Sequence, residues 1–212
     1  RFVLERNFLV AGDPVDGILQ TAGDRPVVLR RHDQHAVGGL DRVVQSVDLT
    51  RYAGTWYEVA LLPNRFQRQC VSDSQANYKL DGERVRVVNR CRRADGSVEE
   101  IEGKARVIAG SNNAKLEVSF FWPFWGDYWI VALDPDYRHV LVGEPSRKYA
   151  WLLSRTPNPG DAVIDNYLSI AQALGFDRGA FVRTPADKPI APIASAAKRA
   201  ESQPEAKMTI TA

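Results

Sequence analysis

Short runs of alternating hydrophobic and polar residues fill the middle of the chain. In the clearest run, 84–92, Val85, Val87, Asn89 and Cys91 share one face of an extended strand, and arginines dominate the other face. Such alternation is typical of a strand with one buried and one solvent-exposed face. Further runs also favour strand, and they cover residues 55–62, 71–79, 98–108, 114–121, 128–133, 139–142 and 150–156. The run 128–133 is apolar on both faces, which leaves its register open.

Turn signals separate these runs at short intervals, as at Asp81-Gly82 and Asp95-Gly96. Eight short strands joined in this way predict an all-β protein, either an antiparallel sandwich or a closed barrel. Apolar residues then recur at helical spacing over 158–174, and Gly175 provides a stop signal. One amphipathic α-helix is therefore expected after the strands.

Two flanking segments lack this patterning. Residues 1–46 show no sustained period, so an irregular N-terminal extension is expected, with one short helix or strand as an option within it. Residues 185–212 are rich in Pro, Ala and charged residues and contain no aromatic residue. Such a segment buries too little surface to offset its ordering entropy, which predicts a disordered tail. The predicted domain is 47–184.

Composition narrows the functional classes. The chain has 212 residues, is 44% hydrophobic and carries a net charge of +2. This hydrophobic content is sufficient for a packed core, and nothing in the charge favours nucleic acid as a partner. The longest apolar stretches are far shorter than the roughly 20 residues of a membrane-spanning helix. The chain opens with Arg1, so we expect a processed product or fragment whose signal segment is already missing.

Three ordered motifs resemble those of the lipocalin family. Gly54-Thr55-Trp56-Tyr57-Glu58 resembles the family's G-x-W-Y-E opening, Asp134-Pro135-Asp136-Tyr137 its second motif, and Arg155 its third. The stretch from about residue 47 to 182 is similar to the bacterial outer-membrane lipocalins and apolipoprotein D. The resemblance implies an eight-stranded up-and-down antiparallel barrel with one C-terminal α-helix packed outside.

The barrel needs one closed end. Trp56 is large enough to plug it, and an antiparallel walk along the strands returns Arg155 to the same end. A guanidinium stacked on an indole adds roughly 0.5–2 kcal/mol. We therefore expect Trp56 and Arg155 to close the barrel, with Gly54, Asp134 and Tyr137 at the same end. The loops near 63–69, 93–96, 122–127 and 144–148 should then surround the open mouth.

Candidate ligand-binding residues follow from the resemblance and from strand alternation. Trp151, Asn89 and Tyr78 match pocket positions of the apolipoprotein D pattern, and a two-residue turn at 81–82 sets Tyr78 opposite Val85. Alternation directs neighbouring side chains to the same inner face, where ordinary core packing is the competing interpretation for the aliphatic ones. The full set, with Trp125 at the rim, is Trp151, Asn89, Tyr78, Phe120, Leu116, Val118, Tyr128, Trp125, Leu153 and Val87.

Such a cavity suits an acyl chain with a polar head group. About ten buried CH₂ groups, at roughly 0.8 kcal/mol each, contribute on the order of 8 kcal/mol before ordering costs, which predicts micromolar affinity or somewhat tighter. The resemblance implies fatty acids or lysophospholipids, bound, stored or transported in the bacterial cell envelope, in the periplasm or at the outer membrane. Arg147 or Lys148 is a candidate contact for the head group.

The aromatic run 120–125, FFWPFW, falls at the expected mouth. Exposed clustered aromatic residues mark a ligand gate, a partner site or a membrane contact, and a loop that covers its own core is the alternative. Peripheral membrane contact through Trp122, Phe124 and Trp125 is one hypothesis, and a homodimer is another.

Cys70 and Cys91 lie on one face of adjacent predicted strands, with Cys91 opposite Ser72. A bulge or wider turn brings them within disulfide reach, about 4.4–6.8 Å between Cα atoms. We predict a disulfide, which favours a binding protein over an enzyme. Two other functions stay open: a thiol-dependent lipid isomerase, and an interaction module that docks through its aromatic rim. No cofactor is expected, and His32 with His35 is too weak a signal for a metal site.

Overall fold

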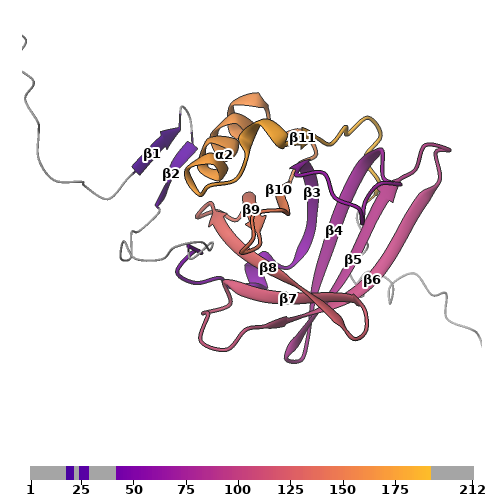
Figure 1. Ribbon diagram of the computed structural model, residues 1–212, viewed down its shortest axis with the longest axis horizontal. Helices are drawn as coiled ribbons and strands as arrows, with labels where there is room; N and C mark the ends of the chain where they lie inside the picture. Colours follow the sequence, from indigo (N-terminus) through magenta and orange to yellow (C-terminus); the bar gives the residue numbers. More distant parts are fainter. Residues whose placement is uncertain (1–17, 22–23, 29–41, 192–212) are drawn as a thin grey trace, which may run out of the picture.

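The computed structural model describes residues 18–21, 24–28 and 42–191, and its centre is a closed antiparallel barrel (Figure 1). Each strand pairs with the next along the chain, and β10 returns to pair with β3. The predicted eight-stranded barrel is confirmed. Its strands are β3 (Gly54–Leu61), β4 (Ser72–Asp81), β5 (Arg84–Arg92), β6 (Val98–Val107), β7 (Lys115–Phe121), β8 (Phe124–Leu133), β9 (His139–Gly143) and β10 (Ala150–Ser154).

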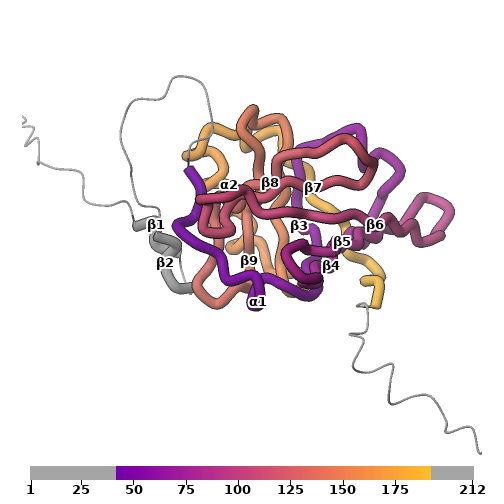
Figure 2. The backbone as a smooth tube through the Cα atoms, turned by 90° about the horizontal axis from the view of Figure 1, so that it is seen from below, coloured from indigo at the N-terminus to yellow at the C-terminus, as the bar shows by residue number. Residues whose placement is uncertain are grey.

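The predicted helix is also present. α2 (Asp161–Ala173) follows the barrel and lies on the side opposite the β5–β6 hairpin, in Figure 1 and in Figure 2. Its buried residues Ile164, Tyr167 and Ile170 pack against the outside of β8, β9 and β10. Gly175, with φ +87, stands just past the helix end. A left-handed glycine there is a common helix terminator, so the expected stop signal acts as predicted.

Two apolar clusters stabilise the domain. One lies between α2 and the outer face of the barrel. The other fills the barrel interior, where Trp56, Ile130, Val140 and Val142 have 0% exposure. Every barrel strand contributes to the interior cluster, and the contributing residues alternate along the strand as the pleat requires.

The β4–β5 hairpin turns one residue later than the sequence suggests. Asp81 pairs with Arg84, so Gly82 and Glu83 form the turn and Tyr78 lies opposite Val87, not Val85. Gly82 has φ +58, a conformation that glycine adopts without steric cost. The turn therefore centres on the glycine, and the predicted register was wrong by two residues.

A bulge in β4 brings the two cysteines together. The β4–β5 register shifts between Ser72 and Gln75, and Asp73 in between has φ 55. Cys91 consequently reaches Cys70, with 5.4 Å between the Cα atoms, and the predicted disulfide is confirmed. The bond attaches the loop after β3 to the wall of the barrel, and it occupies both cysteines of the chain.

The N-terminal flank differs in part from the expected irregular segment. It includes a hairpin, β1 (Ile18–Thr21) with β2 (Asp24–Val28), and a short helix, α1 (Leu49–Tyr52), precedes the barrel. His32 and His35 lie outside the described residues. No helix in the described ranges is long and apolar enough to cross a membrane.

The C-terminal segment after α2 is part of the barrel wall. After η1 (Arg178–Ala180), β11 (Val182–Arg183) pairs with β3 where β4 has separated from it. The Asp73 amide then donates to Pro185 O at 2.8 Å, and the Lys188 amide donates to the Asp73 carboxylate at 3.0 Å. Placing the start of the disordered tail at 185 was therefore wrong, and residues 192–212 lie outside the described part.

Removing the disulfide should loosen the domain measurably. The bond closes a loop with a sequence separation of 21 residues, so replacing both Cys70 and Cys91 with Ser should lower the free energy of unfolding by about 3 kcal/mol. Urea unfolding of the two proteins measures this difference. Thiol titration of denatured, unreduced protein is the control, and it should detect no free thiol. Equal unfolding midpoints would contradict the prediction.

Candidate functional site

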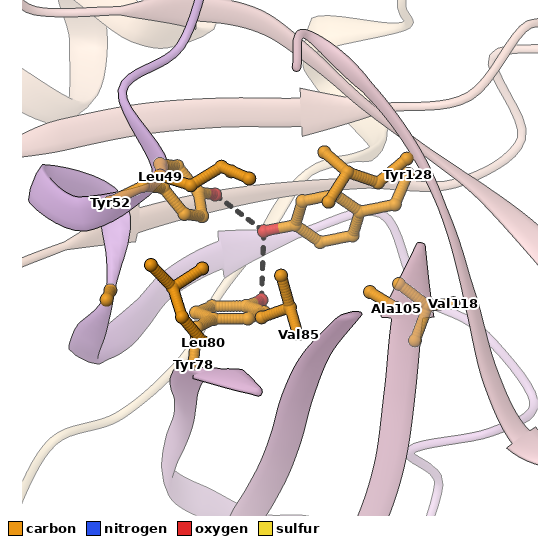
Figure 3. Close-up of a pocket in the computed structure, with 10 residues that line it drawn as sticks. Leu49, Tyr52, Tyr78, Leu80, Val85, Ala105, Val118 and Tyr128 are labelled. Carbon is orange, nitrogen blue, oxygen red and sulfur yellow. Dashed lines mark hydrogen bonds between the residues drawn. The ribbon is translucent and has the colours of Figure 1, made fainter. Parts of the chain in front are cut away.

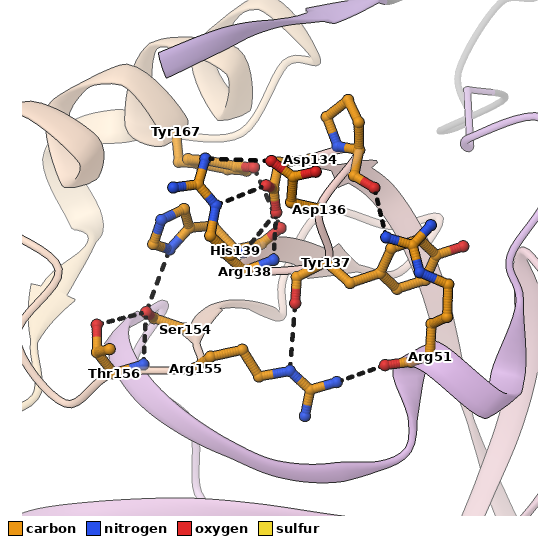
Figure 4. Close-up of polar contacts among 11 residues, drawn as sticks. Arg51, Asp134, Asp136, Tyr137, Arg138, His139, Ser154, Arg155, Thr156 and Tyr167 are labelled. Atoms are coloured by element: carbon orange, nitrogen blue, oxygen red, sulfur yellow. Dashed lines mark hydrogen bonds and ion pairs between the residues drawn. The ribbon is translucent and has the colours of Figure 1, made fainter. Parts of the chain in front are cut away.

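The floor of the barrel is organised around Arg155, directly after β10. Its guanidinium carbon lies 3.8 Å from the centre of the Trp56 ring. The same group donates hydrogen bonds to five main-chain carbonyls, those of Arg51, Tyr52, Ala53, Thr55 and Tyr137, at 2.7–3.2 Å. Figure 4 shows the bonds to Arg51 and Tyr137. These five carbonyl oxygens accept the hydrogen bonds of the Arg155 guanidinium, so its positive charge is stabilised without a carboxylate partner. The two side chains lie where the antiparallel walk along the sequence expects them.

Gly54, Asp134 and Tyr137 lie at this end too. Gly54 has φ +96, and a β-carbon there would stand 3.4 Å from the guanidinium. Asp134 accepts hydrogen bonds from the amides of Arg138 and His139, which shapes the β8–β9 turn. The Asp48 amide donates to the Tyr137 hydroxyl at 2.9 Å, and that contact joins the turn to the start of α1.

Replacing Arg155 at the closed end of the barrel with the shorter lysine should destabilise the domain. Arg155→Lys keeps the charge but loses the planar stack and most of the five hydrogen bonds, so unfolding should become easier by about 2–4 kcal/mol. Arg106→Lys is the matched control, because Arg106 also stacks on an indole, Trp125 at 4.2 Å, but on the solvent-exposed face. That control should cost less than about 1 kcal/mol. Similar unfolding midpoints for the two variants would refute this role.

Three tyrosine hydroxyls meet above the floor. The Tyr128 hydroxyl lies 2.6 Å from that of Tyr52 and 2.9 Å from that of Tyr78 (Figure 3). Burial raises the pKa of Tyr78 to about 12, and it raises the pKa values of Tyr52 and Tyr128 well above the ordinary value. All three are therefore neutral near pH 7, and they act as hydrogen-bonding groups in an otherwise apolar wall.

A small cavity of about 10 Å³ adjoins these tyrosines. Four candidate ligand-binding residues line it, namely Tyr78, Leu116, Val118 and Tyr128, together with Tyr52 and Leu49 from the α1 end. This volume suits about one water molecule and is too small for an acyl chain. A ligand reaches this end only if the surrounding side chains change rotamer.

The mouth half of the barrel carries a second polar cluster. The Trp151 indole N–H donates to Gln67 Oε1 at 2.7 Å, and Gln67 Nε2 donates to the buried Glu58 carboxylate at 2.7 Å. The Thr184 hydroxyl donates to the other Glu58 oxygen at 2.6 Å. Burial raises the pKa of the Glu58 carboxyl, and hydrogen bonds from Thr184, Gln67 and Ser74 offset part of that shift.

Glu58 and Gln67 were not among the residues predicted for the site. Alternation from Trp56 directs Glu58 inward, and its cross-strand partner Leu153 belongs to the interior cluster, so the sequence contained that signal. Gln67 lies in the irregular loop between β3 and β4, where no periodicity indicates direction.

Asn89 faces the interior from β5, between Val87 and Cys91. Its side-chain carbonyl oxygen is buried and has no hydrogen-bond partner within the described part of the chain. An unsatisfied buried acceptor costs about 1–3 kcal/mol, so such a group is expected to receive a donor from water or from a ligand.

The remaining inner-wall candidates are mostly placed as the alternation predicts. Phe120 packs into the interior cluster across Gly103, where any β-carbon would clash with its ring at 2.7 Å. Val87, Leu153, Leu116 and Val118 belong to or contact the same cluster.

Trp125 was assigned to the pocket rim, and the structure corrects this. In β8 the residues Tyr128 and Ile130 face the interior, and Gly126 lies opposite the inner-wall residue Val118. Trp125 falls on the other face by the same alternation, beneath Arg106 and Lys104. Arg147 also differs from its expected contact with a ligand head group, because its Nε donates to Leu174 O at the end of α2. Lys148 remains exposed beside the mouth.

The aromatic run forms the tip of the β7–β8 hairpin at the mouth. Phe121, Trp122 and Phe124 are 69%, 79% and 76% exposed. Phe66, Val71 and Val98, on or beside the other mouth loops, are also exposed. The large exposed apolar residues therefore gather at this end of the barrel, whereas Leu80 stands alone near the floor.

Comparison with known proteins agrees with this geometry. A model described as a lipocalin-like domain matches residues 47–186. This chain belongs to the lipocalin family. It is 43% identical over 142 residues to the outer membrane lipoprotein Blc of Escherichia coli K12, which covers 66% of the chain and 80% of that protein. It is 34% identical to apolipoprotein D of Macaca fascicularis, over 64% of the chain and 75% of the relative.

A solved lipocalin structure supports the fold independently. Insecticyanin from the tobacco hornworm Manduca sexta superposes with a TM-score of 0.58 at 24% sequence identity, covering 69% of this chain and 85% of that one. At this level of identity the likeness concerns the fold alone. The recognition made from the three sequence motifs is confirmed.

Proposed function

We propose that this lipocalin binds a small single-chain lipid, a fatty acid or a lysophospholipid, and stores or transports it without chemical change. The observation that carries the proposal is Asn89: an apolar interior contains a buried acceptor that lacks a partner among the described residues. Trp151 and Gln67 supply further polar groups at the mouth, where the head group of a tail-first ligand would lie.

Two observations favour binding over catalysis. Cys70 and Cys91 are joined, so neither sulfur is a thiolate nucleophile in this state. The relatives named Blc are outer membrane lipoproteins, and we propose the bacterial envelope, periplasm or outer membrane, as the compartment of this chain as well.

Trp151 should be needed for ligand binding. Trp151→Leu removes the indole N–H and a large part of the apolar contact at the mouth, so the dissociation constant for an acyl ligand should rise at least about tenfold. Displacement of a fluorescent acyl probe measures it, and lipid extraction followed by mass spectrometry of purified protein shows whether acyl species co-purify.

Trp125→Leu is the matched control, because Trp125 lies on the outer face. This variant should bind the probe like the unmodified protein. Equal losses in the two variants, or no binding by the unmodified protein, would argue against an interior lipid site.

We also propose that the hairpin tip touches a membrane surface while lipid is exchanged. Phe121, Trp122 and Phe124 project from the same end as the mouth. Aromatic rings partition favourably into the interface between head groups and acyl chains. Trp125 stands beside the tip with one ring face stacked on Arg106, so the proposed anchors are the three more exposed rings.

Polar replacement of the tip should weaken vesicle binding. Trp122→Ser with Phe124→Ser should reduce co-sedimentation with phosphatidylethanolamine–phosphatidylglycerol vesicles at least about fivefold. Leu80→Ser, an exposed apolar residue near the floor, is the control and should bind normally. Light scattering tests the homodimer hypothesis: a dimer that dissociates in the tip variant, with unchanged vesicle binding, would assign the tip to self-association instead.

A further inference from the structure

The inner wall near the mouth carries two acceptors, a buried carboxylate and a buried carbonyl oxygen without a partner. Glu58 presents a carboxylate, and Asn89 presents a carbonyl oxygen with no partner in the described part of the chain. The indole N–H of Trp151 is a donor there, but Gln67 already accepts its hydrogen bond. A ligand head group that only accepts hydrogen bonds therefore has to displace Gln67 before it gains the indole N–H.

Positive charge is lacking from the same wall. The lysines and arginines of the described barrel strands share the outer face, where Arg86, Arg90 and Arg106 form ion pairs with Glu102, Glu100 and Glu117. Arg155 is the inward-facing cation of the described barrel, and its guanidinium is fully engaged at the floor. The loop residues Arg65, Arg68 and Lys148 are exposed to solvent at the rim, outside the wall.

A carboxylate ligand would meet Glu58 in this setting. The Gln67 side chain bridges the Trp151 indole and Glu58 with two hydrogen bonds of 2.7 Å. A ligand carboxylate that took over the indole N–H would replace the Gln67 amide and stand beside the Glu58 carboxyl. Two carboxylates that share a site without a cation repel each other, and one of them must take up a proton. A hydroxyl in the same place can donate to Glu58.

We infer that Glu58 and Asn89 determine head-group specificity, and that the mouth selects single-chain lipids with an uncharged, hydroxyl-bearing head group over fatty-acid anions. This inference rests on the proposed binding of a single-chain lipid in the interior, and it changes the preferred head group from a fatty-acid carboxylate to a neutral hydroxyl group. Glu58 rejects the anion, and Asn89 receives the donor. A glycerol monoester or a long-chain alcohol has the required chemistry.

Three ligands that share the same acyl chain separate the effect of head-group charge from the effect of head-group hydrogen bonding. Laurate is an anion, methyl laurate is neutral without a donor, and monolauroylglycerol is neutral with two hydroxyl donors. Their dissociation constants are measured at about pH 8, where laurate is ionised, by displacement of an uncharged fluorescent probe. The glycerol ester should bind tightest and laurate weakest, with about tenfold between these two.

Two variants test the roles that the inference gives to Asn89 and Glu58. Asn89→Leu should remove most of the advantage of the glycerol ester over the methyl ester, a loss of about fivefold, and leave laurate unchanged. Glu58→Gln should tighten laurate relative to the methyl ester. The outer-face replacements Asn77→Leu and Glu102→Gln are the matched controls and should leave all three constants unchanged. Thermal unfolding verifies that each variant is folded.

The outcomes are distinct. If laurate binds the unmodified protein as tightly as the glycerol ester, the inference is wrong while the proposed lipid-binding function stands. The inference is also wrong if Asn89→Leu weakens all three ligands equally, because Asn89 then acts through packing. If none of the three ligands displaces the probe or changes the tryptophan fluorescence, the proposed function fails, and the inference fails with it. The comparison of the three ligands on the unmodified protein does not depend on the Glu58 variant folding.

Discussion

The stacked pair of Arg155 and Trp56 is the constraint on which the rest of the barrel depends. A single guanidinium collects carbonyls from α1, from the start of β3 and from the β8–β9 turn. These segments are distant in the chain, so the contact fixes where the first and last barrel strands meet. Once that end is fixed, the antiparallel connections send the β3–β4, β5–β6, β7–β8 and β9–β10 loops to the other end. The Arg155 contact therefore decides which end of the barrel is closed and which end is surrounded by loops.

The division of polar groups between the two ends has chemical consequences. At the floor, neutral tyrosines and a fully engaged arginine leave little unmet hydrogen-bonding capacity. At the mouth, Glu58 and Asn89 retain acceptor capacity, and the outer arginines are neutralised by glutamates on β6 and β7. Interior chemistry and surface charge are thus decoupled, because the pleat of the sheet separates them residue by residue.

Alternation in the sequence was sufficient to predict the strands and most of the inner wall. The run 84–92 became β5 with the same bounds, because β5 pairs with β6 without interruption. Predictions were wrong where the alternation of β8 was not followed from the inward-facing Tyr128 to Trp125, and where a glycine moved the turn, as at Gly82. The position of the bulge in β4, which brings Cys91 to Cys70, leaves no mark in a hydrophobic pattern.

Contacts from loops were the other part that the sequence could not supply. Gln67 meets Trp151 across 84 residues of chain, and Thr184 meets Glu58 across 126. No local period governs such contacts, since both partners are placed by the fold of everything between them. Glu58 is different, because it lies on β3 and its alternation with the inward-facing Trp56 indicates an inward carboxylate.

The separation of β4 from β3 at the mouth has a consequence for how the molecule comes into being. The gap is filled by Val182–Arg183 and the residues that follow, which hold Val59, Asp73 and Glu58 together. This filler is translated after all eight strands and after α2. A nascent chain can therefore form all eight barrel strands while the mouth end of β3 is still unpaired on the β4 side. This edge is covered only after the segment that begins at Val182 has been synthesised.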